Sequence, residues 1–445
     1  MFGEPQKTAK PPPEISVPEI DRAIMGGIIA TNIYSGAAAI GAKQGAIYHR
    51  NFYGTLHFDP PPKKTSFQTV YDLGALTKPL ATALGILWLV SKGRVTLEAP
   101  VSRLLKDFGG PAWDKILIEH LLDHSSGMLH RLPFYEKLKA EQEKNPQVVV
   151  VGNRVGEARV REMIAKDPVK KGPGELFTYS EINFMLLGWI IEAITQKRLD
   201  VFLQNEIYKP LGLNDLFFVD KTDAKTPYAK RQFIATEKCP WRKRLLIGEV
   251  HDSDAYTMGG VAGHAGLFGT VDDVYKLSQM LLDSYLGKPG APFHAGTVRR
   301  FFKRSQRPCN KTWALGWDTP PPKEGMCGGR MSRSAVGHLS LTGCTVWLDL
   351  QHECVTVLLC NRVHPTAAGK DEFIQKFRPH LEDLHQGYSK AWTPPPPEEE
   401  EEDEYAAVRA REMAKKKKMG MAGAQKPAGP PQSGAPKKGP ASPPK

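Results

Sequence analysis

The chain has 445 residues, of which 41% are hydrophobic, enough to bury a substantial core in one large domain or two smaller ones. Its formal net charge is +12, but most of the excess positive charge lies in the last part of the chain. The charge therefore does not indicate a specific nucleic-acid partner, and we expect none. The six cysteines form no C-x-x-C pair, which predicts reduced core cysteines of a cytoplasmic protein.

The first elements along the chain are a flexible lead-in over residues 1–15, then a helix and an antiparallel strand pair within 23–54. The stretch MFGEPQKTAKPPPEISVPEI has no apolar core and no cleavage pattern, so we expect no secretory signal and a cytoplasmic location. The longest apolar run, Leu80 to Val90, is about half a membrane span, so we expect no transmembrane segment.

The central elements are mostly helical. A buried helix is predicted to begin just before Lys78, and residues of about 95–265 are predicted to form helices and long loops. A helix from Val271 precedes two or three adjacent strands within 333–364 and a last helix near 372–384. Strands at both ends with helices between them predict an α+β architecture.

Composition also predicts the domain boundaries. After about residue 393 large apolar residues almost disappear, and an acidic block is followed by a basic, Pro-rich block. Such a segment cannot offset the entropy cost of ordering, so we expect a disordered tail that either aids solubility or docks a protein partner. The predicted organisation is a flexible segment 1–15, a domain 16–392 with an α/β part of about 16–95 and 270–392 and a helical part of about 96–269, and a tail 393–445.

Lys78 is a charged residue near the start of an apolar helix, where burial is costly unless the charge is paired or used. A residue three positions earlier lies on the same helix face. In an S-x-x-K pair, the Lys amine can take the proton of the Ser hydroxyl, which then attacks a carbonyl carbon. In this chain the earlier position is Ala75, so the motif lacks its nucleophile.

Over about residues 16–390 the sequence resembles the serine β-lactamase and penicillin-binding-protein superfamily, most closely the class C β-lactamase-related serine hydrolases. The stretches that carry the resemblance are YDLGALTKPLAT, VSRLLKDF, IEHLLDHSSGM, PGELFTYSEINFMLLGWIIEAIT, GEVHDSDAYTMGGVAGHAGLFGTVDDVYKLSQMLL, GHLSLTGCTVWLD and NRVHPT. The resemblance implies an antiparallel sheet flanked by helices, an inserted mostly helical region, and a pocket between these two parts.

The resemblance also implies roles for single residues. The S-x-x-K, tyrosine and H-T-G motifs of the family correspond to Ala75-Leu76-Thr77-Lys78, Tyr179-Ser180-Glu181 and His338-Leu339-Ser340. The retained catalytic positions are Lys78, Tyr179 and His338. The two backbone N–H groups of the oxyanion site are expected to remain available at Ala75 and Leu341. The expected substrate-binding positions, for a small carbonyl or carboxylate ligand, are Ala75, Glu181, Ser340 and Leu341.

Two functions follow from these motifs. The first is a catalytically impaired pseudo-hydrolase with a binding or scaffolding role, in which Lys78 is a relic paired with Tyr179 and nearby carbonyls or an anion-binding group. The alternative is an active hydrolase of ester or amide bonds. It would use water activated by Tyr179 or Glu181, or a displaced nucleophile among Thr77, Ser340 and Cys344.

Several histidines need a separate interpretation. His124, in the sequence HSSG, is predicted to be a turn-capping or core histidine. His251, Asp252 and His264 could be imagined as a metal set, but their spacing is not typical of one. We therefore expect no metal and no cofactor.

Overall fold

The computed structural model describes residues 13–29, 32–166, 171–222, 228, 230–307, 309, 312–323 and 325–395. The chain divides into two units, Met1–Pro394 and Pro395–Lys445, and the structural statements below concern the first. The predicted disorder and docking role of the tail 393–445 lie outside the described residues, apart from its first three positions. Most of the predicted flexible segment 1–15 also lies outside them.

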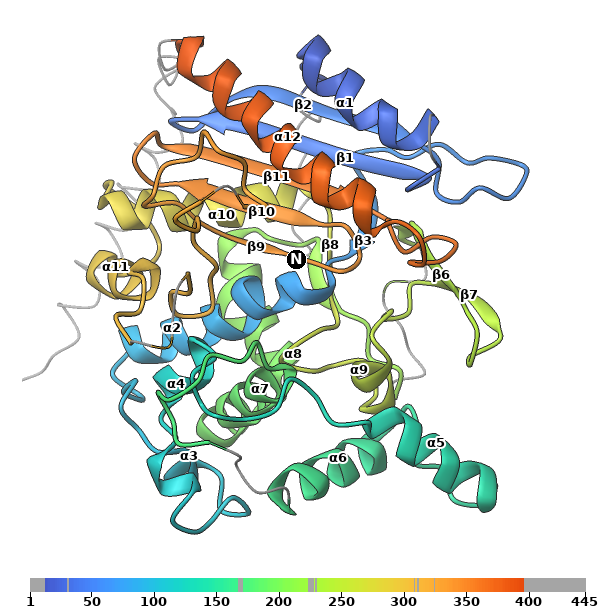
Figure 1. Ribbon diagram of the computed structural model, residues 1–445, viewed down its shortest axis with the longest axis vertical. Coiled ribbons are helices and arrows are strands. Elements are labelled where there is room, and N and C mark those ends of the chain that lie inside the picture. The colour runs from blue at the N-terminus through green and yellow to red at the C-terminus, as the bar shows by residue number, and fades with distance from the viewer. Residues whose placement is uncertain are drawn as a thin grey trace, which may run out of the picture. The chain divides into compact units, whose positions relative to one another are not determined.

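The main sheet is antiparallel and is built from both ends of the domain (Figure 1). Its strand order is β2-β1-β11-β10-β9. These strands are β1 (Gly36–Lys43), β2 (Ala46–Gly54), β9 (Val336–Leu339), β10 (Thr345–Asp349) and β11 (Cys354–Cys360). β1 joins the two ends because it pairs with β2 on one side and with β11 on the other, with Ala37 opposite Cys360. The predicted α+β class and the sheet made from both ends are confirmed.

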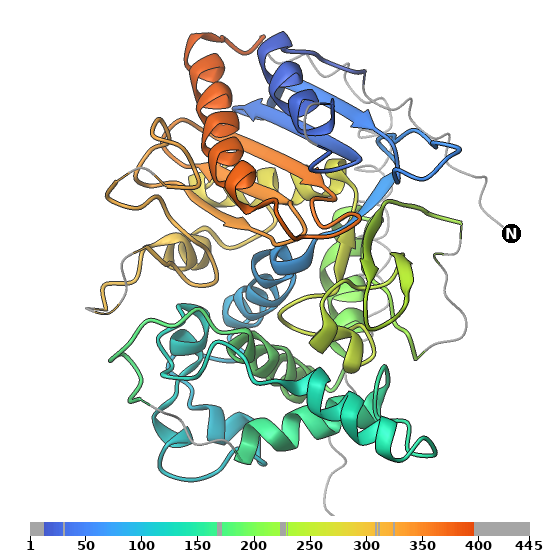
Figure 2. The same ribbon diagram turned by 45° about the vertical axis from the view of Figure 1, so that its right-hand side comes forward.

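Helices cover both faces of this sheet. α1 (Pro18–Ile29) and α12 (Asp371–Ala391) lie side by side on one face, and α10 (Val271–Leu286) lies on the other (Figures 1 and 2). Successive side chains of a strand point to opposite faces. In β1, Ala37 and Ala39 accordingly belong to the apolar cluster of α1 and α12, whereas Ala38 and Ile40 belong to the larger core with α10.

The region between the two parts of the sheet is helical, as predicted, but within 96–269 it also contains short strands that the sequence did not predict. Its helices are α3 (Val101–Leu104), α4 (Ile118–Leu122), α5 (Phe134–Lys144), α6 (Arg154–Lys166), α7 (Glu181–Thr195), α8 (Leu199–Leu203) and α9 (Ser253–Thr257), and α11 (Ala295–Phe302) follows α10. Single turns of other helix types lie at Trp113–Lys115, Gln204–Tyr208 and Lys209–Leu211.

The short strands form two further sheets. One has the order β4-β8-β3-β5 and the other pairs β6 with β7. Their bounds are β3 (Thr69–Asp72), β4 (Leu216–Phe218), β5 (Gln232–Phe233), β6 (Ala235–Cys239), β7 (Arg244–Ile247) and β8 (Leu267–Gly269). Strands this short carry too little alternation to be told from loops in a sequence.

The central helix begins irregularly. A 3-10 turn over Gly74–Leu76 is followed by a π-helical stretch over Lys78–Ala83 and then by α2 (Leu84–Ser91). Pro79 has no N–H to donate to this first turn. The Thr77 hydroxyl donates to the carbonyl of Gly74, at 2.6 Å. By length and composition alone Gly74–Ser91 could cross a membrane, but 78% of it is buried inside the protein, as in the core helix of a folded domain.

Candidate functional site

Ala75 lies three residues after β3, in the 3-10 turn that leads to Lys78. Gly74 has φ +49° in this turn, a left-handed conformation that favours glycine. A Cβ atom on Gly74 would also come within 2.3 Å of Ser340 Oγ. Gly74 thus lets the turn approach the end of β9 closely, and this approach places Ala75 beside the motif at His338–Ser340.

Lys78 is the buried cation of the site, with a side chain that is only 1% exposed. Its Nζ lies 2.6 Å from Glu181 Oε2 and donates to the carbonyl oxygen of His264, at 3.1 Å. The Tyr179 ring centroid lies 5.1 Å from the same nitrogen. The expected contacts of Lys78 with Tyr179 and with a carbonyl are present, and the ion pair with Glu181 is added to them.

The ion pair decides the protonation state of Lys78. Burial lowers its pKa, but the Glu181 carboxylate and the Tyr179 hydroxyl outweigh burial, and the pKa lies above its ordinary value. Lys78 is therefore an ammonium group at neutral pH. An ammonium group cannot accept a proton, so Lys78 does not have the form that a general base requires.

Residues 179–181 are positioned by the start of α7. The Ser180 hydroxyl caps this helix and donates to the carbonyl of Leu129, at 2.7 Å. The Ser180 N–H donates to His124 Nδ1, at 3.0 Å. His124 is fully buried, and burial followed by the charge of Lys78 keeps its pKa far below the ordinary value. The predicted core role of His124 agrees with this geometry, which holds Tyr179 and Glu181 on either side of Ser180.

Tyr179 and His338 are both uncharged. Burial raises the pKa of Tyr179 to about 12, although the charge of Lys78 opposes this shift. Burial, with the charge of Lys78, lowers the pKa of His338 to about 3. His338 Nδ1 lies 2.9 Å from the carbonyl oxygen of Leu339, so Nδ1 carries the proton and Nε2 is an acceptor. This buried Nε2 has no hydrogen-bond partner in the part of the chain that the structure describes.

The oxyanion position differs from the expectation. The N–H of Ala75 donates to Ser340 Oγ, at 3.1 Å, and the same Oγ lies 2.8 Å from Thr342 Oγ1. Ser340 is itself 2% exposed. The expectation that the Ala75 donor remains available is therefore wrong, because the Ser340 hydroxyl accepts from this N–H. Leu341 lies on the adjoining turn with 58% of its surface exposed.

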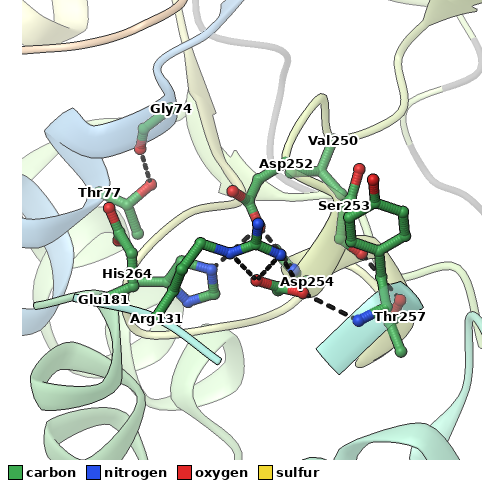
Figure 3. Close-up of polar contacts among 12 residues, drawn as sticks. Gly74, Thr77, Arg131, Glu181, Val250, Asp252, Ser253, Asp254, Thr257 and His264 are labelled. Carbon is green, nitrogen blue, oxygen red and sulfur yellow. Dashed lines mark hydrogen bonds and ion pairs between the residues drawn. The ribbon is translucent and has the colours of Figure 1, made fainter. Parts of the chain in front are cut away.

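Segment 263–267, which leads into β8, fixes the start of the central helix. Thr82 Oγ1 donates to the carbonyl of Gly263, at 2.6 Å, and His264 supplies the carbonyl for Lys78. The N–H of Leu267 donates to Thr77 Oγ1, at 3.0 Å, and this hydroxyl donates to Gly74 (Figure 3). Three hydrogen bonds from segment 263–267 therefore fix the start of the central helix, one of them to Lys78 itself, and the sequence did not point to this role.

Replacement of Thr77 by valine should lower the free energy of unfolding by roughly 1–3 kcal/mol, because it leaves the buried Leu267 N–H and Gly74 carbonyl without this partner. Urea unfolding followed by circular dichroism measures the loss. The exposed Thr96→Val is a matched control and should change stability little. An unfolding curve of Thr77→Val identical to that of the unchanged protein would contradict this account of the segment.

The histidines considered as a metal set are not brought together. His264 Nε2 lies 3.0 Å from Asp252 Oδ1, and this contact helps to lower the pKa of Asp252 despite burial. His251 instead has its Nε2 3.3 Å from Glu237, and its N–H donates to Asp72. Over the described residues, no group of three such side chains could hold a metal ion.

The three candidate displaced nucleophiles are also poorly placed. The Thr77 hydroxyl is fully buried and makes the two hydrogen bonds given above. Ser340 Oγ is hydrogen-bonded to the N–H of Ala75 and to the hydroxyl of Thr342. Cys344 is fully buried, and burial raises the pKa of its thiol, which disfavours the reactive thiolate.

The fold and the motif positions define a serine-hydrolase scaffold, and comparisons with known proteins agree. The family described as Beta-lactamase matches residues 23–378. The chain is 31% identical over 384 residues to the N-acetylmuramyl-L-alanine amidase of Bacillus subtilis (strain 168), covering 80% of this chain and 82% of that protein. It is 32% identical over 340 residues to a Salmonella typhimurium protein provisionally named as a D-alanyl-D-alanine carboxypeptidase, covering 72% and 76% of the two chains.

Solved structures show the same fold. The octameric penicillin-binding protein homologue from Pyrococcus abyssi has a TM-score of 0.62 at 20% identity and covers 84% of this chain and 78% of its own. EstCE1, described as a hydrolase with promiscuous acyltransferase activity, has a TM-score of 0.62 at 18% identity. The match covers 82% of this chain and 98% of the EstCE1 chain. The chain belongs to the β-lactamase family of serine hydrolases.

Proposed function

We propose that this chain is a β-lactamase-family protein in which covalent hydrolysis is impaired and whose pocket serves to bind a ligand or to support a partner protein. One observation carries the proposal. At the nucleophile position Ala75 has a methyl group in place of a hydroxyl, and its backbone N–H is taken by Ser340 Oγ. The same residue therefore lacks both the attacking oxygen and a free donor for an oxyanion.

Acyl transfer through a covalent intermediate needs a nucleophile, a base and preorganised donors for the negative charge. The remaining groups of this site do not replace what Ala75 lacks. Lys78 is protonated and paired with Glu181, and the low pKa of His338 makes it a weak base. These protonation states support a binding pocket more than a catalytic one.

The rival function is hydrolysis of an ester or amide bond, and the names of the relatives support it. They are called an amidase and a carboxypeptidase. In this chain such a reaction would need activated water, because the candidate displaced nucleophiles are buried or hydrogen-bonded. Glu181 as the activating base would have to leave its ion pair with Lys78, and Tyr179 is a neutral phenol.

The purified chain should show negligible turnover of nitrophenyl esters and β-lactams. Loss of a nucleophile that acts as a unit with its base leaves at most roughly 10³–10⁴-fold acceleration over water, and this remaining acceleration depends on a free oxyanion donor, which Ala75 lacks. Intact-mass spectrometry after exposure to a fluorophosphonate or a penicillin should show no stoichiometric adduct, while an active serine esterase treated in parallel is labelled. A stoichiometric adduct would show that a nucleophile is available after all and would overturn the proposal, and turnover that Lys78→Ala abolishes would establish the rival function.

A further inference from the structure

A cavity lined by several cations lies at the C-terminal ends of α10 and α11, which pack against each other (Figure 1). Its volume is about 370 Å³, within the range of cavities that hold small organic ligands. No motif position of the β-lactamase family is among the described residues that line it. Four of its lining side chains are cations, Arg299, Lys303, Arg304 and Arg333.

These four cations differ from most arginines and lysines of the domain because none of them has an ion pair within the described part of the chain. Arg300, which also lies on α11 but does not line the cavity, is by contrast paired with Glu98. No carboxylate is among the described residues that line the cavity. The positive charge is therefore concentrated here without a carboxylate in contact with it.

The carboxyl groups nearest in sequence to the lining residues have other partners. Asp349, which precedes the lining residue Leu350, accepts from the N–H groups of Ser332 and His352. Asp318 accepts from the N–H of Thr319, at 2.8 Å, and burial raises its pKa to about 6. Asp318 alone cannot balance four cations, so the cavity attracts anions from the solvent.

Uncharged oxygen atoms hold the guanidinium groups in place. Arg304 donates to the Thr319 hydroxyl, at 2.7 Å, and to the carbonyl of Pro320, at 2.6 Å. Backbone carbonyls hold Arg299, at 2.8 Å, and Arg333, at 2.6 Å, in the same way. A guanidinium group has five N–H donors. These bonds therefore orient the three groups and leave further donors for a ligand.

The rest of the cavity wall is largely apolar. Phe302 and Leu350 line it, with 3% and 6% of their surfaces exposed. The Phe302 ring is fixed between the Tyr285 ring, at 6.0 Å, and the Trp317 ring, at 5.3 Å, centroid to centroid. A rigid apolar surface beside several cations suits a ligand that has both an anionic group and a small apolar part.

We infer that this cavity is a binding site for a small organic phosphate monoester, whose phosphate group contacts the arginines and whose apolar part covers Phe302 and Leu350. Guanidinium groups match the paired oxygens of a phosphate group. A phosphate monoester carries close to two negative charges and three acceptor oxygens, so it satisfies several cations better than a carboxylate does. The site shares no lining residue with the family motifs, and the inference does not depend on the proposed function.

The test uses phenyl phosphate, inorganic phosphate and benzoate. Isothermal titration calorimetry of the full chain, at pH 8 and constant ionic strength, measures the dissociation constant of each. Phenyl phosphate should bind at a single site, about tenfold more tightly than inorganic phosphate, which lacks the ring, and than benzoate, which has the smaller charge.

Variants locate the binding. Lys303→Gln and Arg304→Gln should each weaken phenyl phosphate binding by about tenfold. Lys303 is exposed, so its replacement tests the site even if loss of the Arg304 hydrogen bonds impairs folding. Arg300→Gln is the matched control, because it removes the same charge from the same helix outside the cavity, and it should leave the affinity unchanged.

A charge reversal completes the test. Ser334 is an exposed lining residue, so Ser334→Glu places a carboxylate beside the cations and should abolish phenyl phosphate binding, whereas Ser334→Gln should retain it. Thermal unfolding checks that each variant is folded. Absence of saturable binding to the unchanged protein, an equal loss in Arg300→Gln and Lys303→Gln, or an unchanged affinity in Ser334→Glu would overturn the inference.

Discussion

The double variant Ala75→Ser, Ser340→Ala should be labelled by a fluorophosphonate roughly 10²–10³ times faster than Ala75→Ser alone. Ala75→Ser restores the hydroxyl three residues before Lys78, and serine and alanine are close enough in volume for the fold to accept the change. The single variant should nevertheless react slowly, because Ser340 Oγ still accepts the N–H of residue 75. Removal of that hydroxyl frees the donor for the negative charge that develops in the transition state.

The measurement is the time course of the intact mass, followed by peptide mapping to residue 75. Ala75→Ser with Leu339→Thr is the matched control, since it alters the same strand end but keeps Ser340, and its rate should stay near that of the single variant. Lys78 remains paired with Glu181 in all three proteins, so the comparison isolates the oxyanion donor. If both double variants react equally, the hydrogen bond between residues 75 and 340 is not what limits acylation.

Glu382→Gln should stabilise the protein by about 3 kcal/mol at pH 8 and have little effect at pH 4.5. Glu382 is buried on α12 and accepts from the Thr356 hydroxyl, at 2.7 Å. Burial raises the pKa of this carboxyl to about 7, against an ordinary value of 4.5. The folded state therefore binds its proton more tightly than the unfolded state. The contribution of this bound proton to the free energy of unfolding is complete below pH 4.5, falls as the pH rises, and is lost above about pH 7. Glutamine has no proton to lose, so the stability of the variant does not fall in this way.

Urea unfolding of both proteins from pH 4.5 to pH 8 measures the difference. The gap between them should grow over this interval and then stay constant. Glu372→Gln, on the exposed side of the same helix, should show no such rise with pH. A gap that does not depend on pH would mean that Glu382 is ionised in the folded protein throughout the interval.

The sequence predicted the fold well because its signals are periodic and long. The strand pair within 23–54, the buried helix near Lys78 and the strands within 333–364 all carry patterns that do not depend on distant residues. The motifs also predicted that Lys78 and Tyr179 meet, and the structure brings them together with His338 on β9.

The chemistry of the site could not be predicted in the same way. The bond from Ala75 N–H to Ser340 Oγ joins residues 265 positions apart and depends on the left-handed Gly74 that lets the two turns approach. The ion pair of Glu181 with Lys78 depends on the direction of one side chain at the start of α7. Glu181 was identified as a substrate-binding position, but its charge-neutralising contact follows only from the three-dimensional arrangement.

The joining of the main sheet from both ends of the domain has a consequence for the order in which the protein is synthesised. The Asn361 side chain accepts from the N–H of Ser35, 326 positions earlier, at the end of the β1–β11 pair. The ribosome therefore releases β1 and β2 long before β11 exists, and an isolated hairpin is at best marginally stable in water. One edge of β1 in the β1–β2 hairpin therefore has no native partner strand until β11 has been synthesised. A nascent chain stopped before β11 would hold β2–β1 and β10–β9 as two separate pairs, since β11 is the strand that lies between β1 and β10.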